Sequence, residues 1–388
     1  MKYIVIFLFF FFNINYSQTK SEFSQIDLKM SKMPDSIKNS TSSIANYINN
    51  NFKTDSEKIR CVFYWTISNI NYDVEKYNNI LKDPKAYSTE TSVERIENTL
   101  VTKKGVCQNY SEVFADIANQ LNIKTYVIPG YTKQNGEVSK SSHAWCASKV
   151  DGKWFLFDPT WGSGYVKNNQ FFKKTNNIYF KINPATHIST HIPFDYLWQF
   201  LNYPITNQEF YDGKTQIDKS KSYFDFETEV DIYDKFSEEE KAIKAAERIE
   251  KNGLKNNLIT NYLSEKKAIK NYESLTKINS DYNDAILLFN DFINYRNNQF
   301  KPKISDEELS KMIHTVKEKF TDCQDRIFKL GVIDSQNIQN VKNIKKSMLD
   351  VLKAVDEQEA FVKEYLSKGK LGRKSMFTKV TFFGLPIN

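Results

Sequence analysis

The stretch Lys104-Gly105-Val106-Cys107-Gln108-Asn109-Tyr110 decides how this sequence is interpreted. Apolar residues follow it at helical spacing, which predicts a helix that begins at Cys107. The N-terminus of a helix carries partial positive charge and free N–H groups, and both favour a thiolate over a thiol. The residues predicted to share one side of this helix are Cys107, Tyr110, Phe114, Ile117, Ala118 and Leu121. Cys107 is therefore expected to face the fold or a cleft.

A histidine and an acid follow in two segments with the pattern of a β-hairpin. Ser142-His143-Ala144-Trp145 opens an alternating strand, and Asp151-Gly152 is a two-residue turn into a strand that ends at Asp158. Counting back from that turn places Trp145 opposite Asp158. It also places His143 diagonally beside Asp158 on the same face, within reach of a side chain. A register slip of one residue would separate the two.

Cys107, His143 and Asp158 are the predicted catalytic residues. A histidine can take the proton of a thiol, and an acid beyond the ring fixes its tautomer and stabilises the imidazolium. Backbone N–H groups at the helix start, including that of Cys107, are suited to hold an oxyanion. Each of these residues alone is more often structural, so the prediction depends on their order and shared faces. Four aromatic residues are candidates for substrate binding or for completing the oxyanion site: Trp65, Tyr72, Trp145 and Trp161.

Three segments carry a resemblance to a known family: Gly105-Val106-Cys107-x-x-Tyr110, His143-Ala144-Trp145 and Asp158-Pro159-Thr160-Trp161-Gly162. They resemble the core of the transglutaminase-like superfamily, and the resemblance extends from about Thr54 to Leu201. It implies an α+β, papain-like core in which the helix bearing the cysteine packs on an antiparallel sheet. It also implies a Cys–His–Asp triad that attacks amides and forms a thioester.

Two details refine this resemblance. His191-Ile192-Pro193, followed by Trp198-Gln199, is similar to a stretch in the kyphoscoliosis-peptidase-like branch of the superfamily. Asn109 stands where relatives often have glycine, and Cys146 stands where asparagine is common. Neither departure removes a triad residue, but both put the shape of the cleft in doubt.

The family does not fix the reaction, because its members cross-link, deamidate, cleave or deglycosylate proteins, and some are inactive. We expect a thiol enzyme that acts on protein or peptide amides without a cofactor, by peptidase-type hydrolysis or transglutaminase-type acyl transfer. The alternative is a catalytically silent binding or scaffold protein whose helical domain engages a protein partner.

The N-terminus has the pattern of a signal peptide. Lys2 precedes an unbroken apolar run from Tyr3 to Phe12, which is too short to span a bilayer, and a polar exit ends at Ser17. A retained anchor is the rival interpretation. We expect a protein that is secreted or periplasmic, with no stable membrane insertion after cleavage. The net charge of +7 is a mild bias, with Lys and Glu interspersed, and no basic arm or aromatic-basic stripe argues for nucleic-acid binding.

The remaining cysteines and histidines predict no further site. The four cysteines are widely spaced, which argues against a disulfide framework, although a Cys61–Cys146 bridge stays open. His187 and His191 are four residues apart and would share a helix face, but Pro193 and the lack of a third ligand count against a metal. A hydrogen-bonded structural role is expected for both, and no metal site is predicted.

The chain divides into three predicted parts: a signal peptide at 1–17, a transglutaminase-like domain at 18–204 and a mainly α-helical domain at 205–388. A capping box at Thr54–Glu57 predicts a helix that ends near Asn69. Segments 18–40, 74–90 and 134–140 are expected to be irregular, and Pro129 suggests that the strand at 125–131 lies at an edge or ends there. The second domain is expected to contain a short strand pair at 223–230 and helices at 237–251, 257–277, 282–295, 305–330 and 335–367.

Overall fold

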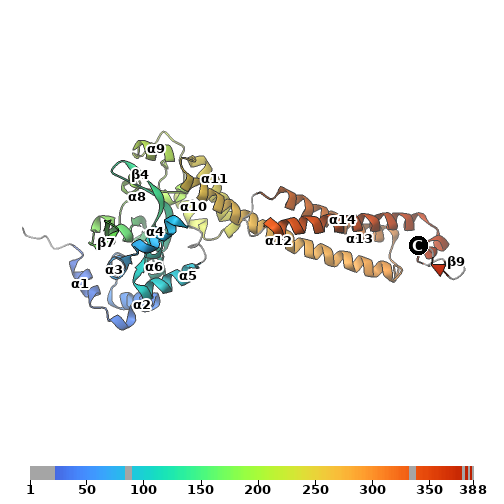
Figure 1. Cartoon of the computed structure of the whole chain (residues 1–388), viewed down its shortest axis with the longest axis horizontal. Coiled ribbons are helices and arrows are strands. Elements are labelled where there is room, and N and C mark those ends of the chain that lie inside the picture. The colour runs from blue at the N-terminus through green and yellow to red at the C-terminus, as the bar shows by residue number, and fades with distance from the viewer. Residues whose placement is uncertain (1–21, 84–89, 332–337, 378–380, 383–384, 387–388) are drawn as a thin grey trace, which may run out of the picture. The chain divides into compact units, whose positions relative to one another are not determined.

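The computed structural model describes residues 22–83, 90–331, 338–377, 381–382 and 385–386, and Figure 1 labels many of their helices and strands. The predicted signal peptide, residues 1–17, lies outside the described residues. The chain consists of two compact units, the first ending at Phe226 and the second beginning at Glu227.

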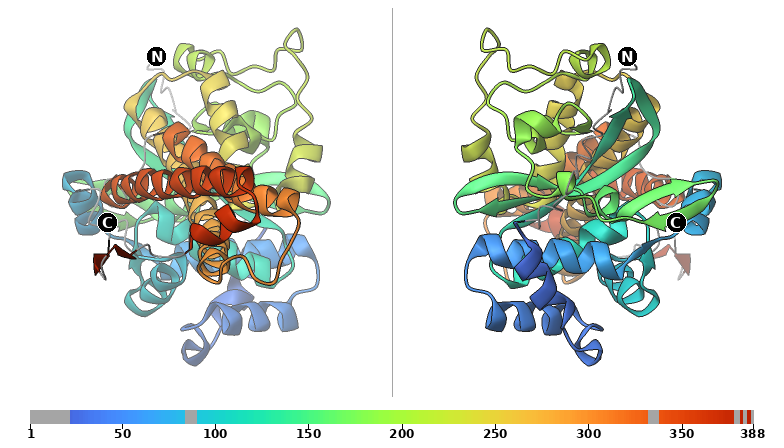
Figure 2. Two further views of the ribbon diagram at one scale, coloured as in Figure 1. Left: turned by 90° about the vertical axis from the view of Figure 1, so that its right-hand side faces the viewer. Right: turned by 90° about the vertical axis from the view of Figure 1, so that its left-hand side faces the viewer.

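A four-stranded antiparallel sheet forms the centre of the first unit, and its twist can be followed in Figure 2. Its order is β5 (Lys153–Phe157), β4 (Glu137–Val150), β3 (Thr125–Gln134) and β8 (His191–Pro193). Two-residue turns with positive φ, at Asn135-Gly136 and Asp151-Gly152, join β3 to β4 and β4 to β5. Val150 pairs with Lys153 in the second hairpin, so the predicted register is confirmed.

Helix α6 (Cys107–Gln120) packs on β3 and β4, and it also contacts α2 (Thr41–Asn51) and α3 (Asp55–Asn69). Its predicted inner side is buried, since Tyr110, Phe114 and Ile117 are fully covered. The predicted capping box at the start of α3 is present, with Thr54 and Glu57 bonded reciprocally. The other elements of this unit are α1 (Ser24–Ser31), η1 (Asp35–Ile37), β1 (Asn71–Tyr72), α4 (Val74–Lys82), α5 (Ser92–Thr102), β2 (Lys104–Gly105), α7 (Pro159–Ser163), β6 (Gly164–Lys167), β7 (Gln170–Lys173), η3 (Asn177–Tyr179), α8 (Pro184–His187), η4 (Tyr196–Gln199) and α9 (Asn207–Asp212).

Several segments expected to be irregular are ordered. The segment from 22 to 40 contains α1 and η1, because buried Met30 and Met33 anchor it to the core. The segment from 74 to 82 is helix α4, capped by the Asp73 side chain, while 84–89 lie outside the described residues. Residues 134–140 continue the β3–β4 hairpin, because Asn135-Gly136 forms a tight turn. Strand β3 continues past Pro129 to Gln134, and β8 pairs with it only from Gly130 to Thr132, directly after the proline.

Residues 205–226 cluster with the first unit, so this unit extends beyond the predicted boundary at 204. Aromatic contacts explain the difference. The ring of Tyr196 lies 5.0 Å from that of Phe224, and the ring of Phe200 lies 6.0 Å from that of Phe226. Phe224 N also donates to Asn202 O at 2.7 Å.

The described part of the second unit is mainly helical. It contains most of α10 (Phe226–Tyr233), α11 (Glu238–Asn252), α12 (Asn257–Asn297), α13 (Asp306–Lys329), α14 (Ile338–Ser367), α15 (Lys370–Ser375) and the short strands β9 (Thr381–Phe382) and β10 (Leu385–Pro386). The strand pair expected at 223–230 is wrong, because α10 occupies most of that segment. The two helices expected at 257–277 and 282–295 are one continuous helix, α12, which carries buried residues along its length, among them Leu275, Ile278 and Ala285. Among the described residues, no helix combines the length and apolar character that a membrane span requires.

Candidate active site

Cys107 is the first residue of α6, and the local sequence fixes that start. Val106 N donates to the side chain of Asn109 at 3.0 Å, which caps the helix, and Asn109 in turn donates to Thr99 at 2.8 Å. Asn109 packs directly on Gly105, where a Cβ atom would lie only 2.4 Å from the Cβ of Asn109. Gly105, two residues before the cysteine, is therefore needed to bring β2 close to the helix. Asn109, one of the two departures from the family pattern, thus accepts a hydrogen bond from the backbone where the helix begins.

His143 lies on β4, and Asp158 directly follows β5. The confirmed hairpin register brings them together, and His143 Nε2 lies 2.8 Å from Asp158 Oδ2. The other ring nitrogen, Nδ1, is then available to Cys107. Cys107 is partly exposed, whereas Asp158 is completely buried. The predicted diagonal neighbours are thus in hydrogen-bond contact.

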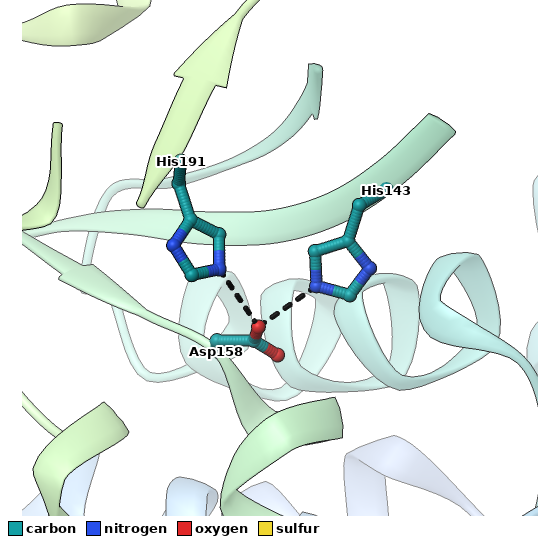
Figure 3. A group of neighbouring side chains, drawn as sticks. All are labelled: His143, Asp158 and His191. Carbon is teal, nitrogen blue, oxygen red and sulfur yellow. Dashed lines mark hydrogen bonds and ion pairs between the residues drawn. The ribbon is translucent and has the colours of Figure 1, made fainter. Parts of the chain in front are cut away.

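Asp158 accepts four hydrogen bonds. Its Oδ1 accepts from the backbone N–H groups of Thr160 and Trp161 at 2.9 and 3.0 Å, which makes it the N-cap of α7. Its Oδ2 accepts from His143 and, at 3.2 Å, from His191 Nε2 (Figure 3). Burial alone would raise the pKa of Asp158, but the charge and hydrogen bonds of the histidines hold it well below its usual range.

The protonation of His143 depends on Asp158 and Cys107. Burial alone would lower the pKa of His143, but the charge of Asp158 and its hydrogen bond outweigh this effect. A hydrogen bond with Cys107 and the charge of that residue act in the same direction, and the pKa of His143 rises to about 10. Near neutral pH the geometry therefore favours an imidazolium at His143 beside the Asp158 carboxylate.

Cys107 and His143 line a cleft of about 1160 Å³ in the first unit. One wall comes from the end of β3 and the start of β4, residues 134–143, and is rich in Ser, Asn and Gln. The rest of the lining is rich in aromatic residues, among them Tyr72, Tyr77, Trp161, Tyr165, Phe171 and Tyr179. The cleft reaches Cys107 at the start of α6.

Residues 42–159 match the family model of the transglutaminase-like superfamily. These residues therefore belong to that superfamily. The predicted fold class is confirmed: an α+β, papain/transglutaminase-like core is followed by a mainly α-helical region.

The proteins that resemble the chain include two relatives and two solved structures. Kyphoscoliosis peptidase from Mus musculus is 29% identical over 196 residues, which cover 48% of this chain and 28% of the mouse protein. Its Homo sapiens counterpart is 31% identical over 165 residues, covering 40% and 24%. The chain thus matches about a quarter of the length of these relatives. A crystal structure described as a TGase is 19% identical with a TM-score of 0.25, covering 43% of this chain and 40% of that chain. The periplasmic domain of TgpA from Pseudomonas aeruginosa is 15% identical with a TM-score of 0.25, covering 35% and 47%.

The four aromatic candidates occupy different places in the transglutaminase-like domain. Tyr72 and Trp161 line the cleft, and Trp161 stacks on His143 with ring centroids 5.4 Å apart. Trp145 is fully buried behind the histidines, 5.2 Å from the ring of His191. Trp65 is also buried, and it is not among the described residues that line the cleft. Only Tyr72 and Trp161 are therefore placed to touch a substrate.

Tyr72 reaches the cleft through a small parallel pairing of β1 with β2, in which Tyr72 lies opposite Gly105. Burial raises the pKa of Tyr72, and the charge of Cys107 acts in the same direction. Its hydroxyl therefore stays protonated and can donate a hydrogen bond near Cys107.

The other three cysteines of the chain are free and buried, so Cys61 and Cys146 do not form the bridge that the sequence left open. Burial raises the pKa of all three thiols. Cys146 instead donates to Ser111 O at 3.3 Å beneath α6. Cys107 is the one cysteine of the four that is not buried.

The sequence predicted a hydrogen-bonded role for His191 but not its contact with Asp158. His191 and His187 are both buried, and their rings stack 4.1 Å apart. His143, Asp158 and His191 also bring three potential metal-ligand atoms within 4.8 Å of one another. In the described structure each of these atoms is already engaged in a hydrogen bond, so we interpret the group as a hydrogen-bonded cluster.

Proposed function

We propose that the transglutaminase-like domain is a thiol enzyme that acts on protein or peptide amide bonds through a thioester. One observation carries the proposal: His143 bonds to buried Asp158 through one ring nitrogen and lies with Cys107 in an open cleft, with its other nitrogen available to the thiol. This is the arrangement that a Cys–His–Asp triad requires. The name of the two curated relatives, kyphoscoliosis peptidase, supports the same class of reaction.

The first chemical step follows from the geometry. The proton of the Cys107 thiol resides on His143 as an imidazolium, and the thiolate attacks the carbonyl carbon of an amide. The carbonyl oxygen becomes an oxyanion, which the N–H of Cys107 at the start of α6 is placed to stabilise. The hydroxyl of Tyr72 is the proposed second donor, because it lines the cleft beside Cys107 and stays protonated.

The second step divides hydrolysis from transfer. His143 gives its proton to the departing amine, and an acyl group remains on Cys107 as a thioester. Water then releases an acid, or a primary amine forms a new amide, and His143 takes the proton of either nucleophile. We propose hydrolysis of peptide bonds as the main outcome. Trp161, stacked on the ring of His143, shields the imidazolium from bulk water during these steps.

The proposal includes the location and the organisation of the chain. Residues 1–17 support export, and the expected setting is the periplasm or the outside of the cell. The described helical unit is proposed to act on its own as a partner-binding module. In the alternative, a silent scaffold, that unit would carry the whole function, and Cys107 would be dispensable.

Mass spectrometry of the intact protein tests the proposal. The wild type and Cys107→Ala are incubated with a library of glutamine-containing peptides, with and without a primary amine. A peptide acyl adduct on the wild type, absent from Cys107→Ala, supports the thioester. Cleaved or deamidated peptides indicate hydrolysis, and amine-dependent products indicate transfer. A wild type that forms no adduct and no product with any peptide, while Cys107→Ala keeps full biological activity, would favour the scaffold.

A further inference from the structure

Asp158 has two histidine partners, although a triad requires one. His143 and His191 both approach Oδ2, at 2.8 and 3.2 Å, from different strands of the sheet (Figure 3). His143 lies on β4 beside the cleft, while His191 lies on β8 and is fully buried. The second histidine does not line the cleft, so its effect on chemistry would pass through Asp158.

The partners of His191 fix its tautomer. Asp158 is ionised and its Oδ2 can only accept, so Nε2 of His191 carries a proton. In a neutral ring Nδ1 is left to accept from Thr190 Oγ1, which lies 2.8 Å from it and 3.4 Å from His187 O. Nδ1 is then an acceptor, and the proton of the neutral ring sits on Nε2, where it is donated to Asp158. Burial lowers the pKa of His191, while Asp158 acts in the opposite direction. The neutral form with a proton on Nε2 satisfies every contact of the ring.

The fold holds this ring tightly in place. Strand β8 approaches β3 at Gly130, where a Cβ atom would lie 2.3 Å from Ile192 O and 2.5 Å from Trp145 Cη2. The ring of His191 contacts four others, since His187 lies 4.1 Å, Trp161 4.5 Å, Trp145 5.2 Å and His143 5.7 Å away. His191 therefore has little freedom to leave Asp158.

We propose that His191 is a positioning residue: as a neutral donor to Oδ2, it holds the Asp158 carboxylate ionised and aimed at His143. This inference rests on the proposed function and assigns a second residue to the same site. A neutral donor stabilises the carboxylate without competing for the imidazolium charge. The thiol proton then resides on His143, which faces the cleft.

The titration of this site involves every ionisable group that packs around Asp158. These groups are Cys107 and Tyr110 on α6, Tyr72 on β1, His143 and Cys146 on β4, Tyr179 on η3, His187 on α8 and His191 on β8. Burial raises the pKa of Tyr72, Tyr110, Tyr179 and Cys146 and lowers that of His187. These five groups therefore stay neutral at mildly acidic pH, where the alkylation of Cys107 is measured.

The pH profile of Cys107 alkylation by iodoacetamide tests the proposal in the full chain, because alkylation reports the thiolate without any amide substrate. His191→Phe keeps a stacked ring but removes the donor. Its alkylation rate at mildly acidic pH should fall roughly tenfold or more, as expected when a charged group loses one hydrogen bond. His187→Phe is the matched control, since His187 stacks in the same cluster and its Nε2 has no partner within the described residues. Its profile should match the wild type.

A second pair of variants covers the case in which His191→Phe does not fold. The amide of Gln can take the place of Nε2 and that of Asn the place of Nδ1. His191→Gln should therefore keep the wild-type profile, and His191→Asn should lose it. The proposal would be overturned if His191→Gln and His191→Asn had the same pH profile of alkylation. It would also be overturned if His191→Phe and His187→Phe lost the same share of the alkylation rate. Failure of the proposed function looks different: the wild type forms no thioester with peptides, yet its alkylation still depends on His191.

Discussion

Asp158 Oδ2 lies 2.8 Å from His143 Nε2, although the two residues lie on different segments of a hairpin. Asp158→Asn keeps the size of the side chain but removes the negative charge that stabilises the imidazolium. We expect the amide-cleaving activity to fall roughly 10³- to 10⁴-fold, as in triads of this kind. Thioester formation and Cys107 alkylation should both decline, and the decline should be largest at mildly acidic pH. An unchanged alkylation profile would show that Asp158 does not support the pair.

The same ion pair predicts how stability depends on pH. The raised pKa of His143 contributes stability that is complete below its unfolded value, about 6.5, and is lost as pH rises through about 10. The lowered pKa of Asp158 contributes stability above its unfolded value, about 3.9, and this is lost as pH falls. Both contributions are complete between about pH 3.9 and 6.5. The difference in unfolding free energy between the wild type and Asp158→Asn should therefore be largest in that range. Urea titrations at several pH values measure it, and a constant difference would contradict the ion pair.

Cys107 should be the only cysteine that reacts in the native protein. Cys61, Cys146 and Cys323 are buried, and burial raises the pKa of their thiols. Limited iodoacetamide should add one label to the wild type and none to Cys107→Ser, and four labels should appear after denaturation without a reductant. Peptide mapping identifies the site. Two or more native labels, or two thiols protected after denaturation, would contradict this expectation.

The parts of the site that the sequence predicted are those that local chemistry fixes. The Asp151-Gly152 turn sets the register of one hairpin, and this alone brings His143 to Asp158. Helical spacing similarly predicts α6 and places Cys107 at its start. His191 could not be placed in this way, because the β3–β8 pairing joins residues far apart in sequence and depends on the close approach at Gly130. Contacts of this kind leave no periodic signal.

The sequence does not predict the ordered structure of residues 22–40, for a related reason. Helix α1 has a weak apolar pattern and is held by Arg60, which is fully buried on α3. Arg60 donates to both carboxylate oxygens of Asp27 at 2.7 and 2.6 Å and to Asn177 at 2.9 Å. The ion pair joins residues 33 positions apart. It orders a segment whose local sequence pattern does not predict a helix.

Breaking this ion pair should destabilise the first unit strongly. Asp27→Ala leaves the Arg60 guanidinium buried without its anion, which typically costs roughly 3–5 kcal/mol. The double variant Asp27→Leu with Arg60→Met removes both charges, so it should recover part of that loss. Urea denaturation measures both variants. A loss below about 1 kcal/mol for Asp27→Ala, as for an exposed pair, would mean that α1 is not held in this way.

Metal removal should leave the site unchanged. The atoms of His143, Asp158 and His191 that could bind a cation are the same atoms that hydrogen-bond to one another. We expect that EDTA does not alter the rate of Cys107 alkylation and that elemental analysis of the purified protein finds less than stoichiometric metal. Stoichiometric zinc, lost together with reactivity on chelation, would contradict this interpretation.

Truncation tests where the first unit ends. Residues 22–226 contain the core built around α3 and α6, while two separate apolar clusters lie wholly within the helical unit. A chain of residues 22–226 should therefore unfold cooperatively and keep selective labelling of Cys107. A chain that ends at 204 loses Phe224 and Phe226, whose rings contact Tyr196 and Phe200, and burial of a single large side chain typically contributes about 1.5–3 kcal/mol. The shorter chain should unfold at a distinctly lower urea concentration. Equal urea midpoints of unfolding for the two chains would support the predicted boundary at 204.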